Sequence, residues 1–186
     1  MGMAIGIKIK RAEGRYDPGA SKFFGTPTVP AHYVESFEDD EIFFCQIRLS
    51  DIAEYDNEGL LPHTGYLYVF LYTEDGKFNL RPDVRYYNGQ PTHAIEGFNL
   101  DVEGYEDYDT EWLMEFYRTG EDADGIKLFG FPSDWNYVND PPRLMMQYDP
   151  LDSEMGFLDS VDGYLYLFFS EDERDFDNIN LHLEYS

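Results

Sequence analysis

Apolar residues in this chain recur in short alternating or aromatic runs, which is the pattern of β-strands. Segment 3–11 alternates isoleucine with glycine and lysine, and segment 176–185 alternates apolar with polar residues in the same way. Segments 41–49 and 84–87 are short apolar runs bounded by turn residues, and one more strand is expected within 93–100. The chain is therefore expected to be rich in antiparallel sheet.

One eight-residue block occurs twice and predicts two buried strands. The first copy, 65–72, reads GYLYVFLY, and the second copy, 163–170, reads GYLYLFFS. Both are aromatic and aliphatic almost throughout, which favours a strand with little exposure to solvent. After the first copy, Asp75-Gly76 predicts a two-residue hairpin turn into a strand over 77–80. Pro82 then predicts that the following residues lie in an edge strand or a break.

Three landmarks recur in the same order and predict an internal duplication. A Lys-apolar-apolar-Gly-x-Pro segment occurs at 22–27 and again at 127–132. In each half it is followed by a glutamine in an apolar run, Gln46 or Gln147, and then by the GYLY block. The predicted organisation is a single domain over 1–186, with repeat one at about 22–100, an acidic connector with a short helix at 101–124, and repeat two at about 127–186.

Two segments carry helix signals. Asp51 and Glu54 have the spacing of a capping box, which predicts a short helix there. Asp109 can cap a helix over 110–119, and Gly120 follows its expected end. The predicted fold class is therefore α+β: mostly antiparallel β, with an internal duplication and a few short helices.

Charge is the most unusual feature of the composition. The 186 residues include 38 Asp and Glu against 13 Lys and Arg, for a net charge of −25. Hydrophobic residues make up 42% and aromatic residues 18%, which predicts a folded core rather than a disordered polyacid. An acidic surface repels nucleic acid and anionic membranes, so neither is expected as a direct partner. A basic protein partner fits the charge, and the alternative is that the charge serves only solubility.

Cys45 is the only cysteine, so an intrachain disulfide is excluded and a reducing compartment fits. No apolar stretch approaches the length needed to span a bilayer, and the N-terminal alternation is that of a strand rather than of a signal peptide. The expected location is the cytoplasm.

No catalytic motif stands out. The four histidines are scattered without metal-ligand spacing, and the glycines form neither a phosphate-binding loop nor a dinucleotide fingerprint. Segment 101–124 holds ten acidic residues, but no window in it has the spacing of a calcium loop, so a solvated connector is favoured over a metal site. No catalytic residue, metal ligand or cofactor is therefore predicted.

Tyrosine among carboxylates is typical of a protein-binding surface. The acidic connector and the segment after the second Gly-x-Pro supply the predicted partner-binding residues: Tyr105, Asp107, Tyr108, Asp109, Glu111, Glu115, Asp122, Trp135 and Tyr137. The alternative is a small-ligand-binding protein or hydrolase-like enzyme with a cleft between the repeats, where Gln46 and Gln147 face each other. Equally, both amides can satisfy backbone groups in the core.

The chain resembles the YwqG-like family of bacterial proteins, whose function is unknown. The resemblance is carried by the two Gly-x-Pro segments and by segments 44–52, 61–67, 144–149 and 155–163. Phe24 and Phe129 depart from the family, which tends to have a second glycine there, and the chain is shorter than typical relatives. The resemblance implies an α+β fold with an internal repeat and no established catalytic residues.

Some members of that family are thought to be encoded beside toxin genes and to act as immunity proteins. Together with the charge, this resemblance predicts a non-enzymatic acidic protein-binding module. Its most concrete form is an immunity or antitoxin-type protein that neutralises a basic partner.

Overall fold

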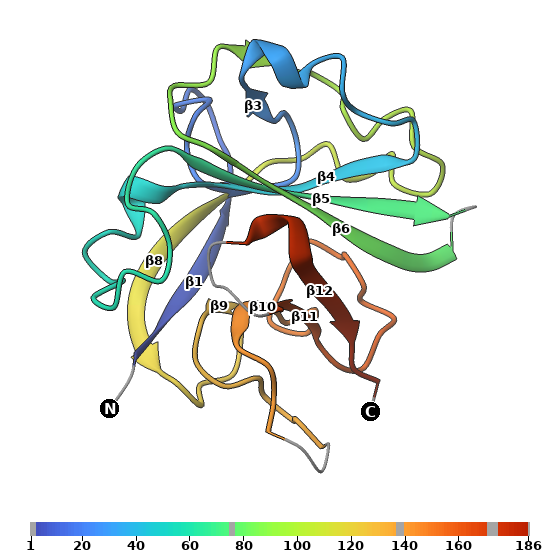
Figure 1. Ribbon diagram of the computed structural model, residues 1–186. Coiled ribbons are helices and arrows are strands. Elements are labelled where there is room, and N and C mark those ends of the chain that lie inside the picture. Colours follow the sequence, from blue (N-terminus) through green and yellow to red (C-terminus); the bar gives the residue numbers. More distant parts are fainter. Residues whose placement is uncertain (1–2, 75–76, 137–139, 171–174, 186) are drawn as a thin grey trace.

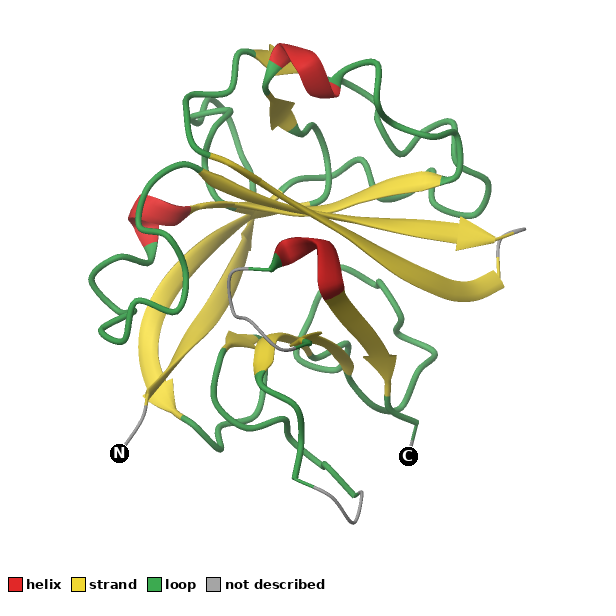
Figure 2. Ribbon diagram, viewed as in Figure 1, coloured by secondary structure: helices red, strands yellow, loops and turns green. Residues whose placement is uncertain are grey.

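The computed structural model describes residues 3–74, 77–136, 140–170 and 175–185, and nearly all of its regular structure is antiparallel β-sheet (Figures 1 and 2). Ten strands form one sheet: β1 (Met3–Arg11), β2 (Lys22–Phe23), β4 (Glu41–Arg48), β5 (Tyr66–Glu74), β6 (Lys77–Tyr87), β8 (Trp112–Gly120), β9 (Lys127–Leu128), β10 (Leu144–Tyr148), β11 (Leu165–Phe169) and β12 (Ile179–Leu183). Two short strands, β3 (Thr28–Val29) and β7 (His93–Ala94), pair separately. Three single-turn 3₁₀ helices complete the described elements: η1 (Ala31–Tyr33), η2 (Leu49–Asp51) and η3 (Phe176–Asn178).

The predicted α+β class is wrong, because the described residues contain no α-helix. The helix expected over 110–119 is instead β8, which pairs with β1 along its whole length, from Met3↔Gly120 to Arg11↔Trp112. The helix expected at the capping box is a series of turns after η2. Trp112 and Phe116 are four residues apart, a spacing that fits a helix face and also one face of a strand.

The sheet rolls around one main core (Figure 1). Strands β4, β5 and β6 cross the middle of the view, β9 to β12 lie below them, and β1 and β8 join the two groups on one side. On the other side β6 lies against β12, so the sheet is nearly closed. The interior is filled by side chains from both groups, such as Phe44, Leu67, Met146 and Leu167.

The two GYLY blocks form buried strands, as predicted, and both faces of each strand are covered. In β5, Leu67, Val69 and Leu71 face the main core. Tyr66, Tyr68 and Phe70 face outward into a second cluster with Val29 and Phe43. In β11, the alternation is the same, and Tyr166 and Phe168 face a third cluster outside the sheet. The outer clusters explain why these strands are aromatic at every second position.

β6 continues through Pro82, which is paired with Leu71, and lies at one end of the strand order. The prediction of an edge strand at Pro82 is therefore confirmed, whereas a break does not occur. The predicted Asp75-Gly76 turn lies outside the described residues. The strand expected within 93–100 is only the two residues of β7.

The strand order is symmetric about the β1–β8 pair. It runs β12-β11-β10-β9-β1 on one side and β6-β5-β4-β2-β8 on the other. The register is also repeated, since Lys22 pairs with Gln46 and Lys127 pairs with Gln147. Each half even has the same register shift, at Phe44 in β4 and at Met145 in β10. In this symmetry β8 is the equivalent of β1, although the sequence pattern assigned its residues to the connector.

Candidate functional site

The two halves share an arrangement of hydrogen bonds around a buried glutamine, which is Gln46 in the first half. Its Oε1 accepts a hydrogen bond from the amide of Thr28 at 2.9 Å, and its Nε2 donates to the carbonyls of Pro18 and Ala20. The hydroxyl of Tyr68 donates to the carbonyl of Thr28 at 2.8 Å. Gln46 and Tyr68 thus clamp the loop that follows the Gly-x-Pro segment.

The second half repeats this arrangement. The Oε1 of Gln147 accepts from the amide of Ser133 at 2.8 Å, and its Nε2 donates to the carbonyl of Gly125. The hydroxyl of Tyr166 donates to the carbonyl of Ser133. Each glutamine therefore bonds to the loops beside its own strand. In the sheet, five strand pairings separate β4, which carries Gln46, from β10, which carries Gln147. The structure agrees with the prediction that the amides satisfy backbone groups, and it does not bring them face to face in a cleft.

Two buried lysines stand beside these glutamines. Lys22 Nζ donates to Glu111 Oε1 at 2.8 Å, whereas Lys127 Nζ donates to the backbone carbonyls of Glu121 and Ala123. Burial lowers the pKa of each lysine to about 8. Glu111, a predicted partner-binding residue, is therefore committed to an internal ion pair.

The other predicted partner-binding residues divide into buried and exposed groups. Tyr105 is buried, and Tyr108 packs against Phe24 at 4.9 Å between ring centroids. Trp135 packs on Phe168 in the outer cluster of the second half. The exposed group comprises Asp107, Asp109, Glu115 and Asp122. Tyr137 lies outside the described residues.

Exposed carboxylates gather where two loops meet. The side chain of Asn99 accepts from the amide of Phe43 at 2.8 Å and donates to its carbonyl, and the ring of Phe98 packs on Phe37. These contacts bring segment 101–109 beside segment 35–40. We call their exposed carboxylates the acidic surface: Glu35, Glu38, Asp39, Asp40, Asp101, Glu103, Glu106, Asp107 and Asp109.

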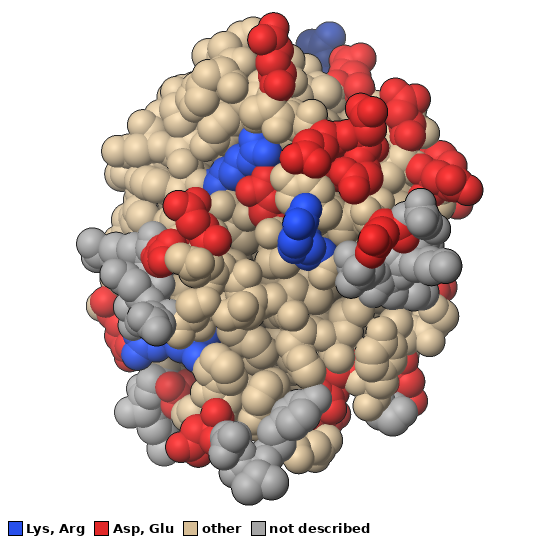
Figure 3. Space-filling view, turned by 45° about the vertical axis from the view of Figure 1, so that its right-hand side comes forward, with Lys and Arg blue, Asp and Glu red and all other residues tan. Residues whose placement is uncertain are grey.

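The acidic surface contains no basic residue, because neither segment includes Lys or Arg. Figure 3 shows acidic side chains gathered on the upper right of the molecule, with few basic side chains among them. Half of this surface, segment 101–109, lies in the predicted acidic connector. The other half, segment 35–40, was not predicted.

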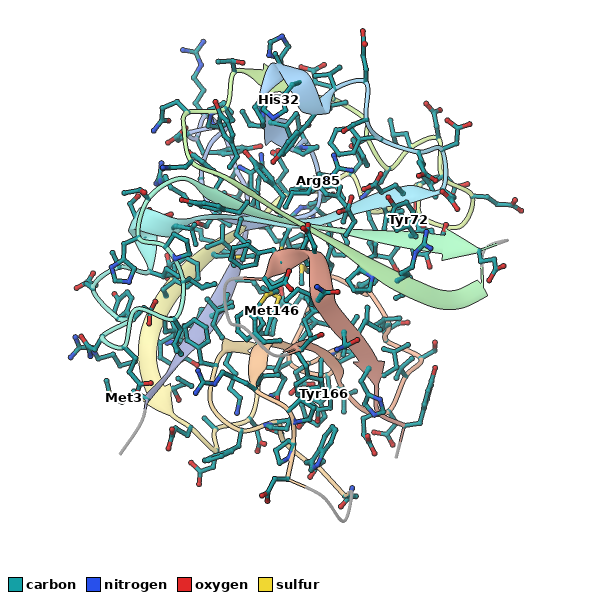
Figure 4. All side chains as sticks on the ribbon, in the orientation of Figure 1. Met3, His32, Tyr72, Arg85, Met146 and Tyr166 are labelled. Carbon is teal, nitrogen blue, oxygen red and sulfur yellow. The ribbon has the colours of Figure 1, made fainter. Side chains whose placement is uncertain are left out.

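Beneath segment 35–40 lies a charge cluster that the sequence reasoning missed. Arg85 Nη2 lies 2.6 Å from Asp83 Oδ2 and 3.3 Å from Glu41 Oε1, and Arg85 Nη1 donates to Ser36 Oγ at 2.6 Å. The guanidinium also lies over the ring of Phe37, at 4.6 Å from its centroid. Figure 4 shows Arg85 between the sheet and the loops above it.

Glu41 is the most deeply buried carboxylate of this cluster. Its side chain is fully buried, and its Oε2 accepts from the amide of Glu38 at 3.2 Å. Burial and the neighbouring Asp83 raise the pKa of Glu41 to about 8. A signal for this cluster exists in the sequence, since Asp83 and Arg85 are two residues apart in a strand and so share one face.

A hollow of about 410 Å³ opens between β6 and η3, with Tyr33, Tyr86 and Phe176 among its lining residues. Among the described residues, no group of three or more His, Cys, Asp or Glu side chains is placed to hold a metal ion. No helix in the described part of the chain is long and apolar enough to cross a membrane.

No protein-family model matches the chain, and no curated protein is significantly similar to it. The resemblance to YwqG-like proteins therefore stays an expectation that rests on the residues quoted for it.

Proposed function

We propose that this protein is a non-enzymatic binding module whose acidic surface holds a basic protein partner. The observation that carries the proposal is the acidic surface itself: nine exposed carboxylates from two loops, without a Lys or Arg in either loop. Its most concrete form is an immunity or antitoxin-type protein that acts in the cytoplasm and covers the functional surface of a cationic toxin.

Electrostatics gives such a surface two properties. Its negative potential accelerates the encounter with a cationic partner by long-range attraction. The same potential repels nucleic acid. Because the Debye length is about 10 Å at 0.1 M salt and about 3 Å at 1 M, this attraction is lost as salt is added. Association with the partner is therefore expected to be strongly salt-dependent.

The loops that carry the carboxylates are anchored to the sheet, which favours binding. Asn99 and Phe98 hold one loop, and the Arg85 cluster holds the other. An anchored loop loses less conformational entropy when a partner binds than a free loop does.

The test is a pull-down from the native host at 50 mM and 500 mM salt with three forms of the protein. The first is the wild type, and the second carries Glu35→Gln, Glu38→Gln and Asp39→Asn. The third, a control with the same change of net charge, carries Glu13→Gln, Glu58→Gln and Asp162→Asn, all at exposed positions.

The proposal predicts that the wild type and the control retain the same basic protein at low salt only, and that the acidic-surface variant retains much less of it. Retention of no basic protein by the wild type would contradict the proposal. Equal retention by the two variants would contradict the assignment of the surface.

A further inference from the structure

The segment that carries Glu35, Glu38, Asp39 and Asp40 has one apolar anchor, Phe37, which packs on Phe70 and Phe98. Among its residues, Phe37 is half-buried, and the four carboxylates are exposed. Its backbone is held by turns, such as the one in which the amide of Ser36 donates to the carbonyl of Tyr33 at 2.9 Å, and at its end by the amide of Thr73, which donates to the carbonyl of Asp40 at 2.8 Å. Between Ser36 and Asp40, side-chain contacts fix the segment to the sheet, among them the ring of Phe37 on that of Phe70, at 4.7 Å between centroids.

Arg85 supplies further side-chain contacts from below. Its guanidinium donates to Ser36 Oγ, lies over Phe37 and lies 5.2 Å from the centroid of Tyr33. One side chain on β6 therefore touches three residues in and beside segment 35–40. The rings of Tyr33 and Phe37 add cation–π attraction to the guanidinium.

The charge of this arrangement is balanced only while Glu41 is protonated. The charged and titratable groups that face Glu41 are Arg85 and Asp83 on β6, Tyr72 on β5, and Glu38 in the loop above. With Glu41 neutral, Arg85 and Asp83 cancel. With Glu41 ionised, its buried carboxylate and the partly exposed carboxylate of Asp83 face one guanidinium beneath a loop that is already acidic.

We propose that Arg85 is a positioning residue for the acidic surface, and that the Glu41–Asp83 pair makes its hold on segment 35–40 dependent on pH. At neutral pH the segment is held in one conformation and presents its carboxylates together. As Glu41 loses its proton in mildly alkaline solution, repulsion loosens the segment. The effect on binding rests on the proposed function, whereas the effect on the loop does not.

Hydrogen exchange in the free protein tests the hold of Arg85 directly. The amides of Val34, Ser36 and Glu38 have acceptors within this region and report its order. In Arg85→Met their protection factors are expected to fall at least tenfold, and Arg85→Lys restores part of the loss. Arg81→Met is the matched control, because Arg81 lies on the same strand and is exposed over Tyr72. Equal protection in Arg85→Met and Arg81→Met would overturn the inference.

The dependence on pH is tested in proteins that keep Arg85. This test therefore remains decisive if Arg85→Met does not fold. In the wild type, the protection factor of the Ser36 amide, which donates to the carbonyl of Tyr33, is expected to fall at least threefold between pH 7 and pH 9. In Glu41→Gln, which stays neutral, it is expected to stay constant. A wild type without this fall, or the same fall in both proteins, would overturn the pH-dependent part.

Binding of a nona-lysine peptide separates this inference from the proposed function. Arg81→Met and Arg85→Met each remove one positive charge, so bulk attraction alone tightens binding in both. A positioning role predicts that Arg85→Met instead weakens binding at least threefold. Absence of binding to the wild type counts against the proposed function, while the exchange measurements still decide the role of Arg85.

Discussion

At the scale of single residues, the buried glutamines show what a sequence can and cannot specify. An amide in an apolar strand predicts hydrogen-bond partners in the core, and both Gln46 and Gln147 have them. Which groups they bond was not readable, because the carbonyls of Pro18 and Ala20 are 28 and 26 residues away along the chain. The spacing of the repeated landmarks along the chain was compatible with two amides that face each other. In the structure, the intervening strands of the sheet keep them apart.

Gln46→Ala is expected to lower the free energy of unfolding by about 2 kcal/mol, because it leaves the buried amide of Thr28 and the partly buried carbonyl of Ala20 without this partner. Urea denaturation measures the change. Gln90→Ala, at an exposed position, is the control and should cost less than about 0.5 kcal/mol. A similar cost at both positions would show that the glutamine does not clamp the loop.

Close packing of the backbone requires the glycine at the start of each GYLY block. A Cβ at Gly65 would lie 2.2 Å from the carbonyl oxygen of Tyr87, and a Cβ at Gly163 would lie 1.8 Å from that of Glu184. In both halves the end of the next strand therefore packs directly on the glycine. The sequence signalled that these glycines are equivalent, but not what they touch.

Gly65→Ala is expected to destabilise the protein by at least about 2 kcal/mol more than Gly104→Ala. Both glycines have positive φ, +84° and +83°, so the backbone strain is matched, and nothing lies within 4 Å of a Cβ at Gly104. The difference in midpoint of thermal or urea unfolding isolates the collision with Tyr87. Equal destabilisation would mean that the strand end moves away without cost.

At the scale of elements, the prediction failed at β8 for a physical reason. An apolar pair four residues apart fits both a helix and a strand, and Asp109 and Gly120 supplied plausible helix ends. Pairing with β1 decided the outcome, because β8 pairs with β1 over nine residues, whereas β9 pairs with it over two. Long-range pairing of this kind is not visible in local sequence, whereas the apolar strands were predicted from their own pattern.

Lys8 and Glu115 test this pairing, since they lie directly opposite each other on β1 and β8. Opposite charges in such a cross-strand pair are worth about 0.2–1 kcal/mol. Lys8→Glu and Glu115→Lys should each lose this term, and the double variant should regain it. The coupling energy from the double-mutant cycle also cancels the change in overall charge. A coupling of zero would count against the register.

At the scale of the whole molecule, the repeated architecture and the acidic surface are separate features. The strand order is repeated in the two halves of the rolled sheet, and the glutamine clamps and the close-packed glycines lie in both halves. The acidic surface belongs to the first half and to the loop before β8, and the described residues of the second half hold no equivalent group. The architecture is therefore shared between halves, while the surface proposed for binding is not.

The buried ionisable groups predict a minimum of stability near pH 8. Glu41 has a raised pKa, so between about pH 4.5 and 8 the folded protein binds more protons than the unfolded chain, and stability falls as pH rises. Lys22 and Lys127 have lowered pKa values, so between about pH 8 and 10.5 the unfolded chain binds more protons, and stability rises. Glu41→Gln should flatten the fall below pH 8 in urea denaturation. Identical slopes in wild type and variant would contradict the assignment of Glu41.

The most direct test of the central claim is calorimetric titration of nona-lysine into two variants with the same net charge. One carries Glu35→Gln, Glu38→Gln and Asp39→Asn, and the other carries Glu13→Gln, Glu58→Gln and Asp162→Asn. If the acidic surface is the binding site, the first variant binds at least fivefold more weakly than the second at 50 mM salt, and both lose binding at 500 mM. Equal affinities would show that attraction comes from the overall charge, and that the acidic surface is not a binding site.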